Sequence, residues 1–252
     1  NTLIGTEAVA HANDPYTLLL TTDATFTINP HLYNKLPYDL ERDFSSITQL
    51  VSFSQLLVVG QRTGINSMAE LMEVAKAKPE ALSYSSYGPG SQPQLATEIF
   101  KQKSGLSILH VPYKGIPQAI AAVVADEVSM SWSGVVSAKS FIANKRIKAL
   151  AFGGKTRLAA FPDVPTMTEL GFPEVDANVW VGLFGPKSMP ASLVQKIHKD
   201  VMIILNEPTF KANEIEAKGY DYSGLGPEEL SKHIKAELLS RKAAVKLSGV
   251  SL

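Results

Sequence analysis

Apolar residues recur along this chain with two alternating spacings, one typical of buried strands and the other of amphipathic helices. Residues 16–21 and 56–59 are short, almost continuous apolar runs, as in strands that are covered on both faces. Over residues 67–78 the apolar positions recur at helical spacing instead, and Ser67 forms a capping box with Glu70. The alternation of the two patterns predicts an α/β protein with a largely parallel sheet.

The remaining segments continue this alternation to the end of the chain. Further strands are predicted at residues 82–85, 106–111, 128–132, 146–152 and 179–184. Further helices are predicted after Ser91 and at residues 4–11, 119–124, 136–144, 192–205, 210–218 and 227–246. The runs 56–59 and 179–184 have neighbours suited to a crossing between two lobes. We expect a discontinuous lobe 1, residues 1–77 and 181–252, and a lobe 2 of residues 78–180.

The composition excludes several classes of protein. The 252 residues hold 24 Lys and Arg against 24 Asp and Glu, so no basic excess points to nucleic acid or to an anionic membrane surface. Cysteine is absent from the sequence, which excludes disulfides, thiolate metal sites and cysteine nucleophiles. No apolar run approaches the ~20 residues that span a bilayer, and no signal peptide is visible at Asn1. We expect an ordinary soluble globular protein.

The most informative local feature is the turn Gly88-Pro89-Gly90-Ser91, between a predicted strand and a predicted helix. The first backbone N–H groups of such a helix face the carboxyl end of the strand, where open α/β sheets bind ligands. Unpaired N–H groups and the positive end of the helix dipole favour an anion, and glycines let it approach the backbone. Two interpretations are open. Either Ser91 only caps its own helix, or the turn binds an anion together with Tyr87 and Gln92.

Two other polar turns follow predicted strands in the same way. Each has two interpretations: an ordinary loop or packed core residue, or part of a ligand site. In the second turn, an indole beside two hydroxyls suits a small organic ligand. The residues concerned are Thr22, Asp23 and Thr25 in the first turn, and Ser131, Trp132 and Ser133 in the second.

The sequence lacks a recognisable catalytic or metal-binding set. Its five histidines form no HxxxH, HxH or HExxH pattern, and no GxSxG motif is present. His110 is the histidine near a candidate cleft, and we expect a structural role for it. Without a nucleophile–base pair or a catalytic pair of carboxylates, we expect a binding protein without metal or cofactor, not an enzyme.

Taken together, eight segments resemble the substrate-binding receptors of tripartite tricarboxylate transporters, the Bug receptors. Each segment alone is weak, but the eight follow the order of the family through nearly the whole chain. They are residues 4–10 (IGTEAVA), 14–20 (DPYTLLL), 28–33 (INPHLY), 36–39 with 43–44 (LPYD and DF), 75–79 (AKAKP), 87–91 (YGPGS), 110–115 (HVPYKG) and 161–166 (FPDVPT).

The resemblance implies a type II periplasmic binding-protein fold, with two α/β lobes joined by hinge strands and a ligand cleft that closes. It implies a periplasmic receptor for a dicarboxylate, tricarboxylate or aromatic acid, gripped through backbone amides, hydroxyls and ordered waters. The matching positions here are residues 22–25, 88–92 and 131–134, the turns that residue chemistry also nominates. The implied partners are membrane permease subunits of a tripartite transporter, and we expect a monomer. The alternatives are a sensing receptor that signals to a sensor kinase, and a periplasmic α/β enzyme.

Two features depart from the family pattern. The family's opening strand and Gly-rich loop, which form half of its carboxylate grip, have no counterpart here, so we expect this chain to begin after them. Many members also carry an Asp after the aromatic residue of segment 131–134, where this chain has Ser133. In relatives that bind amino acids a carboxylate there pairs with the ligand's ammonium. We therefore expect a ligand without an amino group.

Overall fold

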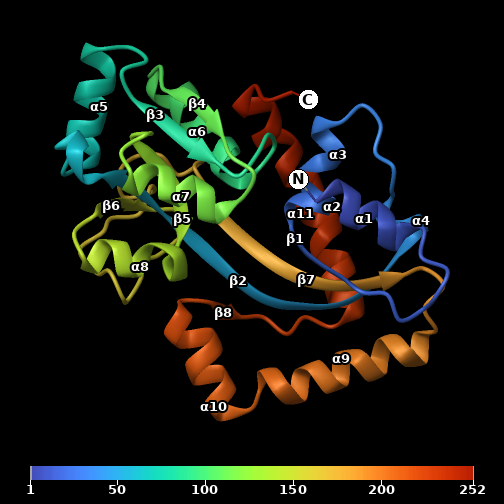
Figure 1. Cartoon of the computed structure of the whole chain (residues 1–252). Helices are drawn as coiled ribbons and strands as arrows, with labels where there is room; N and C mark the ends of the chain where they lie inside the picture. Colours follow the sequence, from blue (N-terminus) through green and yellow to red (C-terminus); the bar gives the residue numbers. More distant parts are fainter. Residues whose placement is uncertain (1, 252) are drawn as a thin grey trace. The chain divides into compact units, whose positions relative to one another are not determined.

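In the computed structural model, which describes residues 2–251, the chain forms two compact units. Unit 1 holds the chain up to Phe53 together with Val179–Val245, and unit 2 holds Ser54–Asn178 with Lys246–Val250. Both boundaries in the middle of the chain fall within strands, β2 (Phe44–Gly60) and β7 (Asn178–Pro186) (Figure 1). Residues 54–77, assigned to lobe 1 from the sequence, lie in unit 2 here, because the second part of β2 pairs with strands of that unit.

Unit 1 is built on antiparallel strands. β1 (Leu19–Thr22) pairs with β7, β7 lies beside the first part of β2, and β8 (Asp221–Tyr222) pairs with β2. Its helices are α1 (Leu3–Ala10), α2 (Ala24–Thr27), α3 (Asn29–Leu32), α4 (Leu40–Asp43), α9 (Ala191–Leu205), α10 (Pro208–Phe210) and most of α11 (Pro227–Ser248). The core is aromatic: the Phe26 ring meets those of Tyr38, Phe44 and Phe184 edge to face, at centroid distances of 6.0, 5.2 and 4.7 Å.

Unit 2 has a mixed sheet. β3 (Ser83–Ser86) lies between β4 (Leu109–Pro112) and β5 (Met130–Gly134) and is parallel to both. β5 and β6 (Ile147–Phe152) pair antiparallel with the second part of β2. The helices are α5 (Met68–Ala77), α6 (Gln92–Ser104), α7 (Ile116–Val124) and α8 (Val135–Ala143), after a short 3-10 turn, η1 (Gln61–Thr63). Buried aliphatic side chains from β2, α7 and β6 form one core cluster of this unit.

Local chemistry explains where helix α5 begins and where helix α6 ends. Ser67 Oγ accepts the N–H of Glu70 at 3.2 Å, which is the serine half of the capping box that the sequence predicts. The Glu70 carboxylate accepts the N–H of Asn66, the residue before the N-cap, at 2.8 Å. Helix α6 ends at Gly105, whose φ of 69° is left-handed and therefore favours glycine.

The expectation of a largely parallel sheet is wrong. Among the described strands only β3 and its two neighbours are parallel, because α6 and α7 carry the chain back across the sheet between them. The remaining named pairs are antiparallel and involve the long strands β2 and β7. The sequence also predicted only the apolar end of β2, because the first part of this strand is rich in Ser, Thr and Gln. The helix predicted at 210–218 is a π-helical segment, η2 (Lys211–Ile215), followed by a 3-10 turn, η3 (Glu216–Lys218).

Candidate functional site

Two of the three predicted turns lie at one edge of the unit 2 sheet. β3 ends at Ser86 and α6 begins at Gln92, so residues 87–91 form the strand-to-helix turn that the sequence predicts. β3 and β5 are parallel, with Ser85 opposite Ser131, so their carboxyl ends meet at the same edge. The sheet thereby brings the 87–92 turn close to segment 131–133, at the edge where open α/β sheets bind ligands.

The backbone of the 87–91 turn is held by hydrogen bonds from nearby groups. Gly88 N–H donates to Ser86 Oγ at 3.3 Å, and Gly90 N–H donates to Gln94 Oε1 at 2.7 Å. Ser91 donates to the Gly88 carbonyl from its N–H at 3.2 Å and from its hydroxyl at 2.6 Å. Gly88 and Gly90 have φ values of 120° and 75°, which favour glycine. The turn is therefore preorganised, and it uses the N–H groups of both glycines itself.

The backbone N–H of Gln92 is a hydrogen-bond donor that has no acceptor in the turn. Ser91 stands at the N-cap of α6 but gives its hydroxyl to Gly88, so it does not cap the helix with its side chain. Pro93 has no N–H, and Gln94 N–H donates to the Ser91 carbonyl at 3.0 Å. The N–H of Gln92, the first of the helix, has no partner within residues 2–251. A lone N–H at the positive end of a 13-residue helix is suited to an anion.

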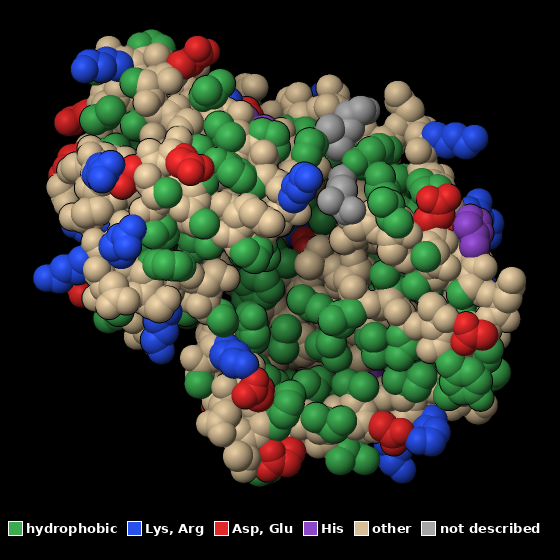
Figure 2. All heavy atoms as spheres, in the orientation of Figure 1, with side chains coloured by type: hydrophobic (Ala, Val, Ile, Leu, Met, Phe, Trp, Pro, Cys, Tyr) green, Lys and Arg blue, Asp and Glu red, His purple; other side chains and the backbone are tan. Residues whose placement is uncertain are grey.

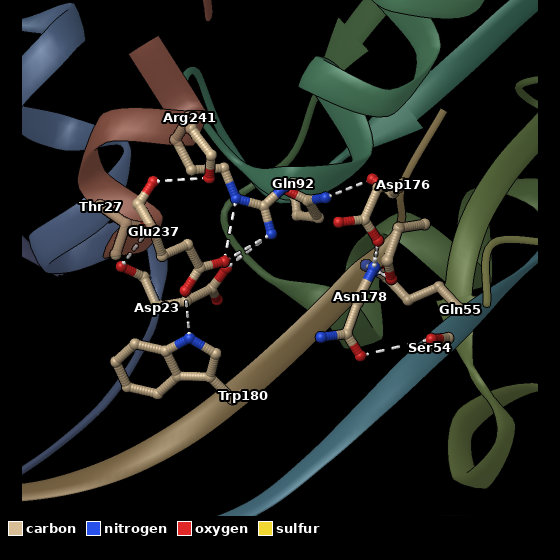
Figure 3. A network of polar contacts seen from close by, with 12 residues as sticks. Asp23, Thr27, Ser54, Gln55, Gln92, Asp176, Asn178, Trp180, Glu237 and Arg241 are labelled. Carbon is tan, nitrogen blue, oxygen red and sulfur yellow. Dashed lines mark hydrogen bonds and ion pairs between the residues drawn. The ribbon is translucent and has the colours of Figure 1, made fainter. Parts of the chain in front are cut away.

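The side chain of Gln92 is held in place separately from its backbone. It is 3% exposed, and its Nε2 donates to the carbonyl oxygen of Asp176 at 2.5 Å (Figure 3). In the same view, Ser54 Oγ donates to Asn178 Oδ1 at 3.3 Å. The Asp176 contact fixes the start of α6 against the segment that leads into β7.

His110, on β4, contacts the turn through Ser86 and Gln94. Its Nε2 lies 2.7 Å from Ser86 Oγ, its Nδ1 lies 3.4 Å from Gln94 Nε2, and its ring stacks on Tyr84 with 4.7 Å between centroids. The Gly90 N–H can only donate, so it makes Gln94 Oε1 an acceptor and turns Gln94 Nε2 toward the imidazole. Nδ1 of His110 is therefore the acceptor, and the proton of the neutral ring is on Nε2, facing Ser86.

This tautomer is unsuited to catalysis. A general base would have to present a lone pair to the Ser86 hydroxyl, whereas His110 presents an N–H to it. Burial lowers the pKa of His110 below its usual 6.5, with a smaller opposing effect from the Glu98 carboxylate. The ring is therefore neutral at pH 7, and His110 acts as a structural partner of the turn.

Segment 131–133 is buried on β5. Ser131, Trp132 and Ser133 are each at most 3% exposed. The Ser131 hydroxyl donates to the Trp132 carbonyl at 3.2 Å, and the Ser133 hydroxyl donates to the Gly134 carbonyl at 3.4 Å. Both hydroxyls thus have backbone partners in the structure, and their role toward a ligand stays a prediction.

The third predicted turn lies in unit 1, at the end of β1. Thr22 is half-buried, whereas Thr25 is fully buried and its Oγ1 lies 2.6 Å from that of Thr21 and 2.8 Å from that of Thr2. Asp23 N–H donates to the Trp180 carbonyl at 3.1 Å, which extends the pairing of β1 with β7. The Thr25 hydroxyl is therefore part of an internal chain of threonines, and Thr22 is the more accessible hydroxyl of the two.

The Asp23 carboxylate lies beside a buried arginine of α11. Arg241 is 7% exposed; its Nη2 and Nε lie 2.8 and 3.0 Å from Glu237 Oε1, and its Nη2 lies 3.7 Å from Asp23 Oδ2. Trp180 Nε1 donates to the other oxygen of Glu237 at 2.5 Å, so three elements converge here (Figure 3). Sequence reasoning missed Arg241, because Glu and Arg four residues apart on a helix form an ordinary surface pair as often as a buried one.

No three His, Asp or Glu side chains in residues 2–251 come together as a metal site requires. None of the described helices combines the length and the apolar character needed to cross a membrane. On the face drawn in Figure 2, Lys and Arg side chains are interspersed with Asp and Glu, without a large patch of one sign.

Several solved periplasmic proteins share this fold. The chain superposes on the structure described as a periplasmic transporter with a TM-score of 0.91 and 32% identity, covering 99% of this chain and 83% of that one. It superposes on the periplasmic binding protein BugD with a TM-score of 0.91 and 26% identity, covering 99% and 84%. For Rpa4515 of R. palustris, solved with adipate, the TM-score is 0.92 and the identity 25%, covering 98% and 83%. The fold is thus that of the periplasmic solute-binding proteins.

The sequence comparisons identify the family. Residues 1–249 match the family described as tripartite tricarboxylate transporter family receptor, and this chain belongs to that family. It is 32% identical over 209 residues to a UPF0065 protein of Bordetella pertussis, and 29% identical over 201 residues to protein BugT of the same organism. These matches cover 82% and 79% of this chain but only 64% and 62% of the two relatives. The predicted family and fold class are confirmed, and the family and these neighbours are solute-binding receptors, not enzymes.

Proposed function

We propose that this chain captures a small organic carboxylate in the periplasm for uptake through the permease subunits of a tripartite transporter. Membership of the receptor family over residues 1–249 carries the proposal. It is supported by the adipate in the R. palustris structure, at 25% identity. The 87–92 turn supports it independently, because the N–H of Gln92 at the start of α6 is a donor without a partner in the described chain.

We propose further that the ligand carries no amino group. An ammonium needs a carboxylate partner, and the position where many family members have Asp is Ser133 here, whose hydroxyl donates to a backbone carbonyl. Asp23 is the single acidic residue among the nominated ones, and it lies beside Arg241. A dicarboxylate, tricarboxylate or aromatic acid therefore fits the available groups better than an acidic amino acid.

Closure of two lobes on the ligand, which the family resemblance implies, is part of the proposal. A ligand closes a binding protein only through contacts that it makes in the closed state and not in the open one. Small-angle X-ray scattering with and without saturating ligand should then show a smaller radius of gyration in the complex. An unchanged radius with bound ligand would contradict closure and leave carboxylate binding intact.

The function is tested by a thermal-shift screen followed by calorimetry. Adipate, succinate, citrate and benzoate are compared with aspartate and glutamate, and adipamide serves as the uncharged control with the shape of adipate. At about 100 times its Kd, a true ligand should raise the melting temperature by about 5–10 °C, and adipamide should have no effect. Binding of aspartate or glutamate without any response to simple carboxylates would contradict the proposed ligand class. No response to any carboxylate would contradict the function.

A further inference from the structure

A chain of hydrogen bonds connects His110 to both glycines of the 87–91 turn. On one side, Gly90 N–H donates to Gln94 Oε1 at 2.7 Å, and Gln94 Nε2 faces His110 Nδ1 at 3.4 Å. On the other side, His110 Nε2 faces Ser86 Oγ at 2.7 Å, and Ser86 Oγ lies 3.2 Å from the Gly88 carbonyl, to which it donates. The direction of every bond follows from the Gly90 N–H, which has no alternative to donating.

Protonation of His110 is incompatible with this arrangement. A second proton on the ring sits on Nδ1 and points at Gln94 Nε2, so that two donors face each other. Rotating the Gln94 amide by half a turn removes that conflict, but it then sets Nε2 against the Gly90 N–H. The turn therefore loses one of the two contacts in either orientation of the amide.

We propose that His110 and Gln94 are positioning residues of the carboxylate-binding turn, and that ligand affinity falls when His110 takes up a proton. Neither residue needs to touch the ligand, because both act through Gly88 and Gly90. The proposal rests on the proposed function for its effect on affinity, while the coupling between His110 and Gly90 does not require a ligand.

The surroundings of His110 set the direction of the pH dependence. The ring is packed against Tyr84 of β3 and against α6, whose charged residues near it are Glu98 and Lys101. These two pair with each other at 2.8 Å, and Glu98 also accepts the Tyr84 hydroxyl at 2.6 Å. Burial is the largest influence and lowers the pKa of His110 below 6.5. The turn is thus intact at neutral pH and is disturbed as the pH falls below that value.

Two substitutions test whether His110 and Gln94 position the 87–91 turn or only stabilise the fold. Gln94→Glu places one carboxylate oxygen on the Gly90 N–H and the other on Nδ1, so the turn accepts a protonated His110 and the pKa of His110 rises. His110→Gln keeps a donor near Ser86 but has no proton to gain. Gln102→Glu, an exposed position on the same helix, controls for the added charge, and His11→Gln controls for removal of an exposed histidine.

The experiment combines NMR titration of the histidine rings and the Gly90 amide with calorimetry of adipate between about pH 5 and 8. In the wild type, the His110 ring and the Gly90 amide should titrate together below 6.5, and affinity should fall by up to about tenfold per pH unit below the pKa. His110→Gln should bind independently of pH, Gln94→Glu should bind at acid pH better than the wild type does, and both controls should follow the wild type.

A Gly90 amide that does not respond to His110, an unchanged His110 pKa in Gln94→Glu, or affinity that rises on acidification would overturn the proposal. The NMR measurement needs no ligand. Absence of binding by every variant at every pH would therefore reject the proposed function, while the coupling of His110 to the turn would still be decided.

Discussion

At the scale of single residues, the site depends on which polar groups remain without a partner once the chain has folded. The sequence nominated hydroxyls and glycines, but the hydroxyls of Ser91 and Thr25 and the glycine N–H groups have internal partners. The N–H of Gln92 has none in the described chain. The sequence therefore identifies residues of suitable chemistry, while the fold decides which of their polar groups remain free to bind a ligand.

Gln92→Pro tests this donor directly. Proline is tolerated at the first position of a helix, where it removes an N–H without breaking a helical hydrogen bond. Gln92→Ala is the matched control, since it keeps the N–H and loses the same contact to Asp176. Calorimetry with adipate should show Gln92→Pro weaker than Gln92→Ala by about tenfold or more, the equivalent of one charge-assisted hydrogen bond. Equal affinities of two folded variants would mean that this N–H does not bind the ligand.

At the scale of elements, helix α11 is joined to β7 by the hydrogen bond from Trp180 to Glu237, and to the start of α2 by the buried Arg241, which faces Asp23. Its guanidinium lies between two carboxylates, Glu237 at 2.8 Å and Asp23 at 3.7 Å. Arg241→Met removes the guanidinium that both carboxylates face, and removal of one partner of a buried ion pair typically costs about 3–5 kcal/mol. Urea denaturation should therefore show a loss of about this size for Arg241→Met.

Two further variants test whether the loss of stability in Arg241→Met comes from the buried charges. Lys242→Met, the exposed neighbour on α11, should leave the unfolding midpoint almost unchanged. The double variant Arg241→Met with Asp23→Asn should be more stable than Arg241→Met alone, because it removes one of the buried charges left behind. Equal stability of the single and double variants would show that Asp23 and Arg241 are not coupled.

At the scale of the whole molecule, we expect net charge to have little influence on the proposed ligand capture. Lys and Arg balance Asp and Glu at 24 each, and the isoelectric point of about 7.2 leaves almost no net charge at neutral pH. The nominated site residues include no Lys or Arg, so we expect an anion to be held there by backbone dipoles and hydroxyls and not by long-range attraction.

Ligand affinity should therefore depend weakly on salt. Between about 20 and 300 mM NaCl at pH 8, where His110 is neutral, the Kd for adipate should change by less than about threefold. Calorimetry at several salt concentrations measures this. A steep loss of affinity with salt would indicate that a charged side chain outside the nominated turns grips the ligand.

The sequence by itself determined the local features and the family. The cap of α5 and the strand-to-helix turn at 87–91 depend on residues a few positions apart, which a pattern can reveal. The eight ordered segments led to the receptor family, which the comparison over residues 1–249 confirms. The polar first part of β2 escaped prediction, because its strand conformation depends on pairing with distant strands and not on its own pattern.

Only the tertiary structure decided which way the polar groups of the turns point. His110 reaches Ser86 because β4 lies beside β3, and Asp23 meets Arg241 because α11 packs near the end of β1. A hydrogen bond requires a donor and an acceptor within about 3 Å, and sequence spacing says nothing of that distance for residues on separate elements. The chain's pattern thus locates the strand-to-helix turn that we propose binds a carboxylate, while the partners that shape this turn, and the lack of a partner for the Gln92 N–H in the described chain, follow from the fold.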